Sequence, residues 1–422
     1  MIRKISDRRS CGNHAKPRVE GSELAQKCLE GRLTQPGLEK RLLGVNFPLC
    51  GQLAEVLEAL NELSRSIFWM LNAIFESSKY REAPMADEST LPLTPLPFLD
   101  AVLAYQKTAA IRAAVEIGLF EAIGTAGADA ETIAARVGAS TRGVRILCDY
   151  LTVLGFLGKS GSLWRQEPVA SAFIDKTSPT SVASIVRFLA GPEFLRLFLE
   201  DPAGYIRRGG TEGLANMAPE DPIWVTFAES MTPFTVAAAK ATAAHVAAWA
   251  ATPRRVLDVA AGAGMFGICV AQACPEASIV AVDWQDVVAV AGRNAERASV
   301  GERYRTLAGD AFGADWGDGY DLVLLANILH HFDHASCVAL LRRVRDSLAP
   351  GGRATIIEFV PNADRITPPI PASFAFMMVA TTQHGDAFTE AEYAAMARDA
   401  GLRPEAAVPL PPSQERLIEL RA

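Results

Sequence analysis

The sequence predicts an α/β protein, in which a doubly wound domain follows a mostly helical domain with a winged-helix outline. Two patterns predict the doubly wound domain: from residue 251 onward strand-like apolar runs alternate with helical segments, and the first run continues into a glycine-rich turn. A third pattern predicts the helical domain, because small and apolar residues recur at helical spacing between residues 98 and 250.

The composition limits the function of the chain. Its 422 residues suggest two or three domains, and the formal net charge of −7 argues against general electrostatic binding to nucleic acid. No apolar run approaches the roughly 18 residues that cross a bilayer, so no membrane span is expected. The 7 cysteines show no CxxC spacing, which predicts a reducing, cytoplasmic location. Small molecules or proteins are the expected partners.

Residues 1–84 differ from the rest of the chain. They carry 13 basic and 10 acidic side chains, whereas the rest carries 28 and 38. Residues 1–48 are polar and aperiodic, which predicts disorder, and residues 51–78 carry an apolar stripe at helical spacing. Residues 85–97 are proline-rich and predict a linker. Two interpretations stay open: the extension belongs to the working protein, or that protein starts near Met85 and the extension is dispensable or a translation artefact.

Residues 98–250 begin with the helical run FLDAVLAYQKTAAIRAAVEIGLFEAI. The following segments, DAETIAARVG and STRGVRILCDYLTVLGFLGKSGSLWRQEP, predict helix, turn, helix and two short strands around Gly158 to Gly161, a winged-helix outline. Such a unit can read DNA or pack against protein. Its second helix offers Arg142 and Arg145 but then mostly apolar residues, so the basic footprint of DNA binding is weak. Dimerisation or roofing of a substrate site is the favoured role.

The glycine-rich turn is the first chemical signal in residues 251–422. Gly262, Gly264 and Gly267 spell GxGxxG, where missing side chains allow the backbone to approach a ligand. Asp283 ends the next predicted strand, 19 residues after Gly264, where a carboxylate can accept hydrogen bonds from ribose hydroxyls. Both features fit a nicotinamide dinucleotide as well as an adenosyl sulfonium.

The later segments continue the alternation. YRTLAG predicts a third strand, followed by Asp310 and Phe312, an acid and an aromatic that could flank an adenine. DLVLLANILHHF predicts a fourth strand that runs into a turn. The helix CVALLRRVRDSLAP is expected to end at Gly351 and Gly352, before a fifth strand, ATIIEF. GLRPEAAVPL and QERLIEL predict a closing strand pair.

Together these motifs carry a family resemblance. VLDVAAGAGMFG, AVDW, GDAF, ANILHHF and LAPGGRATIIEF, in this order and spacing, resemble the class I S-adenosylmethionine-dependent methyltransferases. With the winged-helix region ahead, the chain is similar more narrowly to the small-molecule O-methyltransferases that include caffeate, acetylserotonin and bacterial polyketide or pigment enzymes. The likeness covers about residues 95–422. It implies a Rossmann-like catalytic domain at 251–422, S-adenosyl-L-methionine as cofactor, a hydroxyl of a small aromatic or polycyclic acceptor, and a homodimer.

The resemblance also implies the cofactor site. The methionine part would lie against Asp258, Ala260, Gly262 and Gly264, the ribose against Asp283, the adenine against Trp284, Asp310, Ala311 and Phe312, and Asn327 belongs to the same site. Two departures are visible. Ala260 stands where the family commonly has glycine, and a family lysine near the adenine corresponds to Ala326, so that contact is absent.

The resemblance implies His330 as the general base. A phenol has a pKa of about 10 and an imidazole about 6.5, so a neutral histidine can take the acceptor's proton as the new bond forms. Glu358 would orient His330, while the family's second such glutamate corresponds to Ala387. Neighbouring side chains in a turn point in different directions, so either His330 or His331 is expected to face the pocket. His334 lies nearby in HHFDH, but this spacing lacks a fixed metal-binding frame, so no metal site is predicted.

The acceptor pocket follows from the same resemblance, which places Phe227, Met231, Met378 and Thr382 against the substrate. Three alternatives stay open on the residues alone. The scaffold could methylate an activated carbon or host other chemistry, because one fold supports many reactions. The chain could be a winged-helix regulator that binds a small ligand. The glycine motif and ribose acid also fit a nicotinamide-dependent oxidoreductase.

Overall fold

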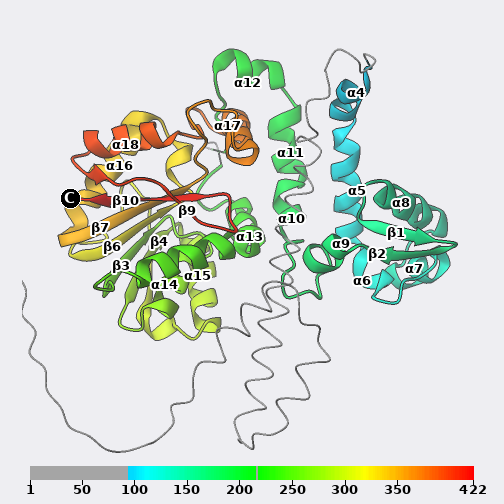
Figure 1. The fold of residues 1–422 in the computed structure, drawn as a ribbon, viewed down its shortest axis with the longest axis horizontal. Helices are drawn as coiled ribbons and strands as arrows, with labels where there is room; N and C mark the ends of the chain where they lie inside the picture. The colour runs from blue at the N-terminus through cyan, green and yellow to red at the C-terminus, as the bar shows by residue number, and fades with distance from the viewer. Residues whose placement is uncertain (1–93, 215–216) are drawn as a thin grey trace, which may run out of the picture. The chain divides into compact units, whose positions relative to one another are not determined.

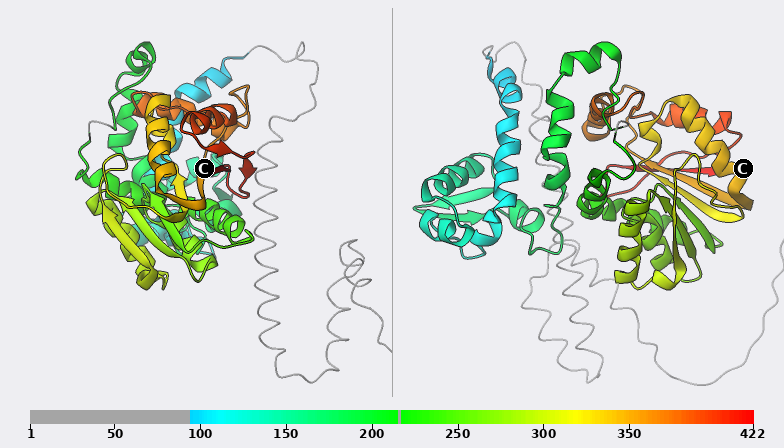
Figure 2. Two further views of the ribbon diagram at one scale, coloured as in Figure 1. Left: turned by 90° about the vertical axis from the view of Figure 1, so that its left-hand side faces the viewer. Right: turned by 180° about the vertical axis from the view of Figure 1, so that it is seen from behind.

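The computed structural model describes residues 94–214 and 217–422, which apart from Thr94 belong to one unit, Pro95–Ala422 (Figures 1 and 2). The predicted extension, its helix at 51–78 and most of the linker lie outside the described residues. Within the described ranges, no helix combines the length and the apolarity needed to cross a membrane.

The first part of the unit has the predicted winged-helix outline. Its elements are α4 (Leu96–Val102), α5 (Ala104–Glu116), α6 (Leu119–Ile123), α7 (Ala130–Val137), α8 (Thr141–Val153), β1 (Leu157–Ser160), β2 (Leu163–Gln166) and α9 (Pro168–Phe173). Asp129 and Ser140 cap α7 and α8 by accepting backbone hydrogen bonds in the first turn. The antiparallel pair β1 and β2 forms the wing. Leu151 of α8 and Trp164 of β2 are buried in one core with α5 and α6.

Four helices lead from this part to the sheet: α10 (Ile185–Leu189), α11 (Pro192–Leu199), α12 (Pro202–Arg208) and α13 (Pro222–Ala247). The Asp221 side chain caps α13, and the helix continues through Pro233 for 26 residues. Small buried residues along its second half, such as Ala238 and Ala239, allow α13 to pack closely against the helices of the sheet domain. This helix therefore carries side chains of residues 222–247 to the catalytic domain.

The second part is a doubly wound sheet with helices on both faces (Figure 1). The strands are β3 (Arg255–Val259), β4 (Ser278–Asp283), β5 (Tyr304–Ala308), β6 (Tyr320–Ala326), β7 (Leu348–Glu358), β8 (Arg403–Pro404), β9 (Val408–Pro409) and β10 (Arg416–Arg421). In the described chain their order is β5-β4-β3-β6-β7-β10-β8, with β9 also beside β10. Strands β3 to β7 run parallel and β10 is antiparallel to β7, which confirms the predicted closing segment.

The sheet is buried on both faces. One core joins it to α13, α14 (Met265–Ala273) and α15 (Gln285–Arg297), and the other joins it to α16 (His334–Ser347) and α18 (Glu390–Asp399). Neighbouring strand residues divide between the two cores: Val256 belongs to the first and Leu257 to the second. This explains why the strands are apolar runs without alternation. The remaining helix, α17 (Pro369–Thr381), follows β7, and short 3₁₀ turns lie at Gly301–Arg303 and Leu329–His331.

The LAPGG segment differs from the prediction. The helix was expected to continue to Gly351 and Gly352, but α16 ends at Ser347 and β7 begins at Leu348. Leu348 pairs with Tyr320 at the start of β6, and the register then shifts before Leu322 pairs with Arg353. The chain between them forms an irregularity in the strand. The prediction was wrong because strand pairing with β6 fixes these residues, and pairing partners are not visible in local periodicity.

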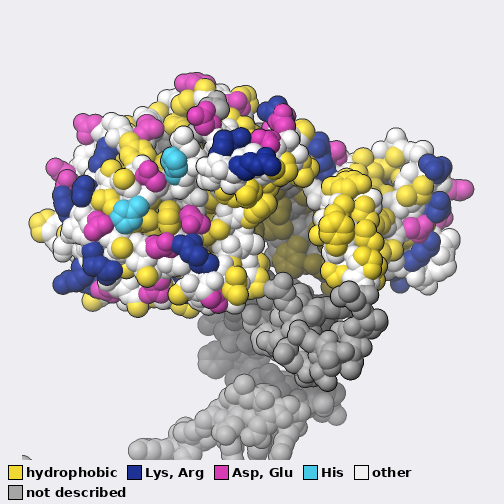
Figure 3. Space-filling model, turned by 90° about the horizontal axis from the view of Figure 1, so that it is seen from above, with side chains coloured by type: hydrophobic (Ala, Val, Ile, Leu, Met, Phe, Trp, Pro, Cys, Tyr) yellow, Lys and Arg dark blue, Asp and Glu magenta, His cyan; other side chains and the backbone are white. Residues whose placement is uncertain are grey.

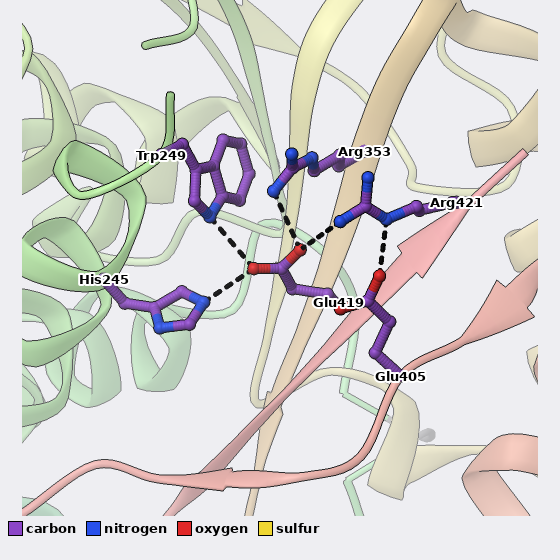
Figure 4. Close-up of polar contacts among 6 residues, drawn as sticks. All are labelled: His245, Trp249, Arg353, Glu405, Glu419 and Arg421. Carbon is purple, nitrogen blue, oxygen red and sulfur yellow. Dashed lines mark hydrogen bonds and ion pairs between the residues drawn. The ribbon is translucent and has the colours of Figure 1, made fainter. Parts of the chain in front are cut away.

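A buried carboxylate joins α13 to the sheet (Figure 4). Glu419 of β10 accepts hydrogen bonds from His245 Nε2 at 2.7 Å, from Trp249 Nε1 at 2.9 Å and from Arg353 of β7 at 3.1 Å. Arg421 lies near the same carboxylate and also pairs with Glu405. Because Glu419 is buried and each of its oxygens has a donor, the network fixes the end of α13 against β7 and β10.

Candidate active site

A cavity of about 510 Å³ lies at the carboxyl ends of β3, β4 and β6. The chain reverses its winding direction between β3 and β6, which is where doubly wound sheets bind ligands. Ten residues predicted from the sequence line this cavity: Phe227, Ala260, Gly262, Asp283, Trp284, Asp310, Ala311, Phe312, Asn327 and Thr382. The fold therefore brings together side chains from residues 227 to 382.

The glycine-rich turn between β3 and α14 has three residues with left-handed backbone. These are Ala260 at φ 54°, Gly262 at φ 55° and Gly264 at φ 79°. A Cβ on Gly264 would lie 2.4 Å from the Tyr304 hydroxyl, so this glycine is needed for packing rather than for ligand contact. A Cβ on Gly262 would meet nothing within 4 Å, and Gly262 lines the cavity. The two glycines thus have different roles.

Asp258 lies beneath the turn and outside the cavity lining. Its Oδ2 accepts a hydrogen bond from the Gly267 backbone N–H at 2.9 Å. Burial raises the pKa of Asp258 to about 7, the nearby Asp283 carboxylate contributes to the increase, and the bond from Gly267 opposes it. Asp258 therefore holds the start of α14 onto β3, and direct contact with a cofactor stays a prediction.

Asp283 is one of three acidic residues that line the cavity, with Asp310 and Asp333. Its Oδ2 accepts from the Gly262 backbone N–H and its Oδ1 from the Trp284 backbone N–H, both at 2.7 Å. Burial raises the pKa of Asp283 to about 6, although these two bonds favour the ionised form. Each carboxylate oxygen keeps acceptor capacity, so the pair of oxygens fits the two hydroxyls of a ribose.

Aromatic side chains form much of the remaining wall. Trp284 packs edge to face with Trp224 of α13, with ring centroids 4.8 Å apart. Phe312 packs in the same way with Phe332, at 4.9 Å. Trp224 and Phe332 line the cavity and were not predicted. Trp224 lies 60 residues before its partner, so no local pattern connects them, whereas Phe332 was visible as the aromatic residue of ILHHF.

The two adjacent histidines point to different surroundings. His330 is buried, and its Nδ1 lies 2.6 Å from Oε2 of Glu358, which is also buried. The other carboxylate oxygen accepts from the backbone N–H groups of Leu329 and His330. His331 lines the cavity, and burial together with the neighbouring His330 lowers its pKa well below the usual range, so its imidazole is neutral.

Four other residues predicted for the site lie outside the cavity lining. Neither His330 nor Glu358 lines the cavity, but the His330 ring packs edge to face on Phe374 of α17, at 4.8 Å, beside the cavity-lining His331. Met231 and the buried Met378 also lie outside the lining.

His334 is exposed and pairs with Asp399, so the three histidines do not converge. The described residues contain no group of three or more His, Cys, Asp or Glu side chains that could hold a metal ion.

The fold and the cavity together indicate a class of protein: a doubly wound α/β protein with a ligand-sized cavity at the switch point of its sheet. Comparisons with known proteins specify it further. Residues 224–403 match the family model of the O-methyltransferase domain, and residues 99–176 match that of the O-methyltransferase dimerisation domain.

Two curated relatives support this match. The 3-hydroxy-5-methyl-1-naphthoate 3-O-methyltransferase of Streptomyces sahachiroi is 32% identical over 305 residues, which cover 72% of this chain and 88% of that protein. The acetylserotonin O-methyltransferase of Mus musculus molossinus is 29% identical, over 72% of this chain and 82% of that protein.

Solved structures show the same fold. A crystallised protein of Nostoc punctiforme is 41% identical, with a TM-score of 0.75, over 79% of this chain and 100% of that chain. Human N-acetylserotonin methyltransferase, solved in complex with S-adenosylmethionine, has a TM-score of 0.68 over 79% of this chain and 99% of that chain. At 22% identity, this second likeness shows the fold alone.

The chain belongs to the O-methyltransferase family. The predictions of its fold class, of an S-adenosylmethionine-dependent methyltransferase and of its cofactor are thereby confirmed. Family membership also decides against the nicotinamide-dependent oxidoreductase and the winged-helix regulator. The cavity fits the cofactor, since Asp283 offers two oxygens to a ribose beside a glycine turn that leaves room for a ligand.

Proposed function

We propose that the enzyme methylates a hydroxyl group of a small aromatic molecule, with His330 as the general base and Glu358 as the residue that orients it. When bound, S-adenosylmethionine would supply the methyl group, with its sulfur–carbon bond breaking as the oxygen–carbon bond forms, while His330 would take the proton of the hydroxyl. The relatives act on acceptors of this kind, naphthoate and acetylserotonin. The aromatic lining of the cavity supports a flat ring system, because aromatic rings pack well edge to face or in offset stacks.

The buried His330–Glu358 pair is the observation that carries the proposal. An ionised carboxylate can only accept hydrogen bonds, so the 2.6 Å contact assigns the proton of His330 to Nδ1. Nε2, on the opposite side of the ring, then keeps its lone pair and can accept the proton of an acceptor hydroxyl. Glu358 cannot turn away, because two backbone N–H groups hold its second oxygen. The pair could therefore act as a general base on an acceptor hydroxyl that reaches Nε2 of His330 beside the cavity-lining His331.

The test is transfer of labelled methyl from S-adenosylmethionine to a panel of hydroxylated aromatics, with mass spectrometry to place the methyl group. A methyl group on oxygen supports the proposal, and one on ring carbon supports the C-methyltransferase alternative. With the best acceptor, His330→Ala is expected to reduce kcat by about 10²-fold or more, since general base catalysis contributes that much. Glu358→Gln should also reduce kcat.

His331→Ala provides the matched comparison, because His331 is the neighbouring histidine and its neutral ring lines the cavity. If His330 is the base, His331→Ala changes KM for the acceptor more than kcat. A large loss of kcat in His331→Ala, with turnover retained in His330→Ala, would reassign the base to His331. Unchanged kcat in both variants would favour catalysis by proximity alone.

We also propose a cytoplasmic homodimer. The match to a dimerisation domain and the exposed apolar side chains of α4 and α5 support the dimer. Hydrophobic side chains gather on the surface where α4 begins, which faces the viewer in the view from above (Figure 3). Cys148, Cys269, Cys274 and Cys337 are buried free thiols, which suits a reducing compartment.

A further inference from the structure

Three neighbouring strands bring polar side chains to one edge of the sheet. Asn327 follows β6, Glu358 ends β7, and Glu415 directly precedes β10. Glu358 belongs to the proposed base pair, but Glu415 has no part in the function derived so far. Its side chain is buried, and a buried carboxylate is costly unless hydrogen bonds compensate it. The partners of Glu415 therefore indicate what it does.

Glu415 reaches across the end of β7 to Asn327. Its Oε1 accepts a hydrogen bond from Asn327 Nδ2 at 2.7 Å, and its Oε2 accepts from the Ser413 hydroxyl at 2.7 Å. The Asn327 backbone is held as well, since its N–H donates to Ile357 of β7 and its φ is 55°, in the left-handed region that asparagine tolerates. Both the backbone and the amide group of Asn327 are thus fixed.

The fixed amide leaves one polar atom of Asn327 for a ligand. Because Glu415 binds Nδ2, the other amide atom must be the oxygen, Oδ1. Within the described residues this buried oxygen has no hydrogen-bond partner, although Asn327 lines the cavity. Buried acceptors are nearly always paired, so a donor on a bound molecule is the expected partner.

The position of Asn327 in the cavity indicates which group of the cofactor donates to its Oδ1. S-adenosylmethionine carries donors on its ribose, its adenine and its amino group. Asp283 at the end of β4 faces the proposed ribose position, and Asp310 and Phe312 the proposed adenine position. Asn327 instead directly follows β6, which pairs with β3, and β3 leads into the turn of Ala260 and Gly262. The amino group of the methionine part is the donor that remains for this place.

We infer that Glu415 is a positioning residue of the cofactor site: it holds the Asn327 amide so that Oδ1 accepts a hydrogen bond from the amino group of the cofactor. The inference rests on the proposed arrangement of the cofactor in the cavity. It does not depend on the identity of the base or of the acceptor, because Glu415 and Asn327 act on cofactor binding. Calorimetry without acceptor therefore tests it.

Measuring Kd for two ligands distinguishes a positioning role of Glu415 from a general structural role. S-adenosylhomocysteine carries the amino group, whereas 5′-methylthioadenosine has the nucleoside without the amino-acid part. In Glu415→Ala, Kd for S-adenosylhomocysteine should rise by about tenfold, the effect of one lost hydrogen bond to a charged group, while Kd for methylthioadenosine stays constant. Glu415→Gln keeps an acceptor oxygen and should restore most of the affinity. Glu405→Ala, an exposed carboxylate of the same C-terminal segment, is the matched control.

A second variant covers the case in which Glu415→Ala does not fold. Asn327→Gly removes the amide and keeps the left-handed backbone. This variant should therefore also lose affinity for S-adenosylhomocysteine and keep its affinity for 5′-methylthioadenosine. The inference would be overturned if Kd rose equally for both ligands, or if Kd for S-adenosylhomocysteine did not rise. If the unchanged protein binds neither ligand, the cofactor arrangement itself fails, which distinguishes the two failures.

Discussion

Ala260 has a left-handed backbone although it carries a side chain, with φ at 54°. The sequence already marked this position, because the resembling enzymes commonly have glycine there. The structure supplies the reason, since the turn between β3 and α14 requires a backbone that glycine adopts freely and alanine does not. The strain of alanine is therefore a property of this chain's own cofactor turn.

Ala260→Gly is expected to stabilise the protein by about 0.5–1 kcal/mol, because relief of the left-handed strain exceeds the entropy that glycine loses on folding. Urea unfolding without ligand measures it. Ala261→Gly is the control. Ala261 does not have a positive φ, so glycine brings no relief of strain there and its greater loss of backbone entropy should destabilise the protein. A similar loss of stability in both variants would contradict the explanation.

The cofactor affinity should depend on pH through Asp283. Burial raises its pKa to about 6, and the ionised carboxylate is the form that accepts two ribose hydroxyls. Protons compete with the cofactor, so affinity should be constant above pH 6 and fall by about tenfold per pH unit below it. Calorimetric titration with S-adenosylhomocysteine between pH 5 and 8 measures this. In Asp283→Asn the affinity should be lower and the break near pH 6 absent; a break that persists would belong to another group, such as Asp258.

At the scale of elements, α13 depends on its attachment to the sheet. Glu419 binds His245, Trp249 and Arg353 (Figure 4). Helix α13 also carries Trp224 and Phe227, which line the cavity. Most elements were visible from local patterns, including the winged-helix outline and the alternation from residue 251. The start of β7 was not, because its pairing with β6 is a contact between distant segments.

Glu419→Ala should destabilise the protein by about 2 kcal/mol, because it leaves the half-buried donors of Arg353, His245 and Trp249 without their buried acceptor. Urea unfolding monitored by circular dichroism measures the loss. Glu405→Ala, which removes an exposed carboxylate paired with the same Arg421, should change stability by less than about 0.5 kcal/mol. Equal effects of the two substitutions would show that the buried network does not hold α13.

At the scale of the whole molecule, the proposed homodimer needs an apolar surface to bury. The side chains of Phe98, Leu99 and Val102 on α4, of Leu103 between the two helices and of Tyr105 on α5 are all exposed in the described unit. Clustered exposed apolar residues of this kind mark protein interfaces. This surface lies at the beginning of the segment that matches the dimerisation domain.

The double substitution Phe98→Asp with Val102→Asp should convert the dimer to a monomer, because two charges would be buried without partners. Light scattering with size-exclusion chromatography gives the mass. Val153→Asp, at an exposed apolar residue on α8, is the control and should leave the mass unchanged. A dimer that survives the double substitution would place the interface elsewhere.

The sequence by itself determined the class of fold and the cofactor, and it predicted ten of the residues that line the cavity. These rest on local features, such as strand and helix periodicity, the GxGxxG turn and the acid after β4, so they are visible in short stretches of chain. Only the tertiary structure decided that His331 lines the cavity and His330 does not, that Asp258 binds the backbone N–H of Gly267, and that Glu415 fixes Asn327. Those assignments depend on contacts between strand ends that are distant in sequence, and burial and hydrogen bonding at such contacts are properties of the packed sheet.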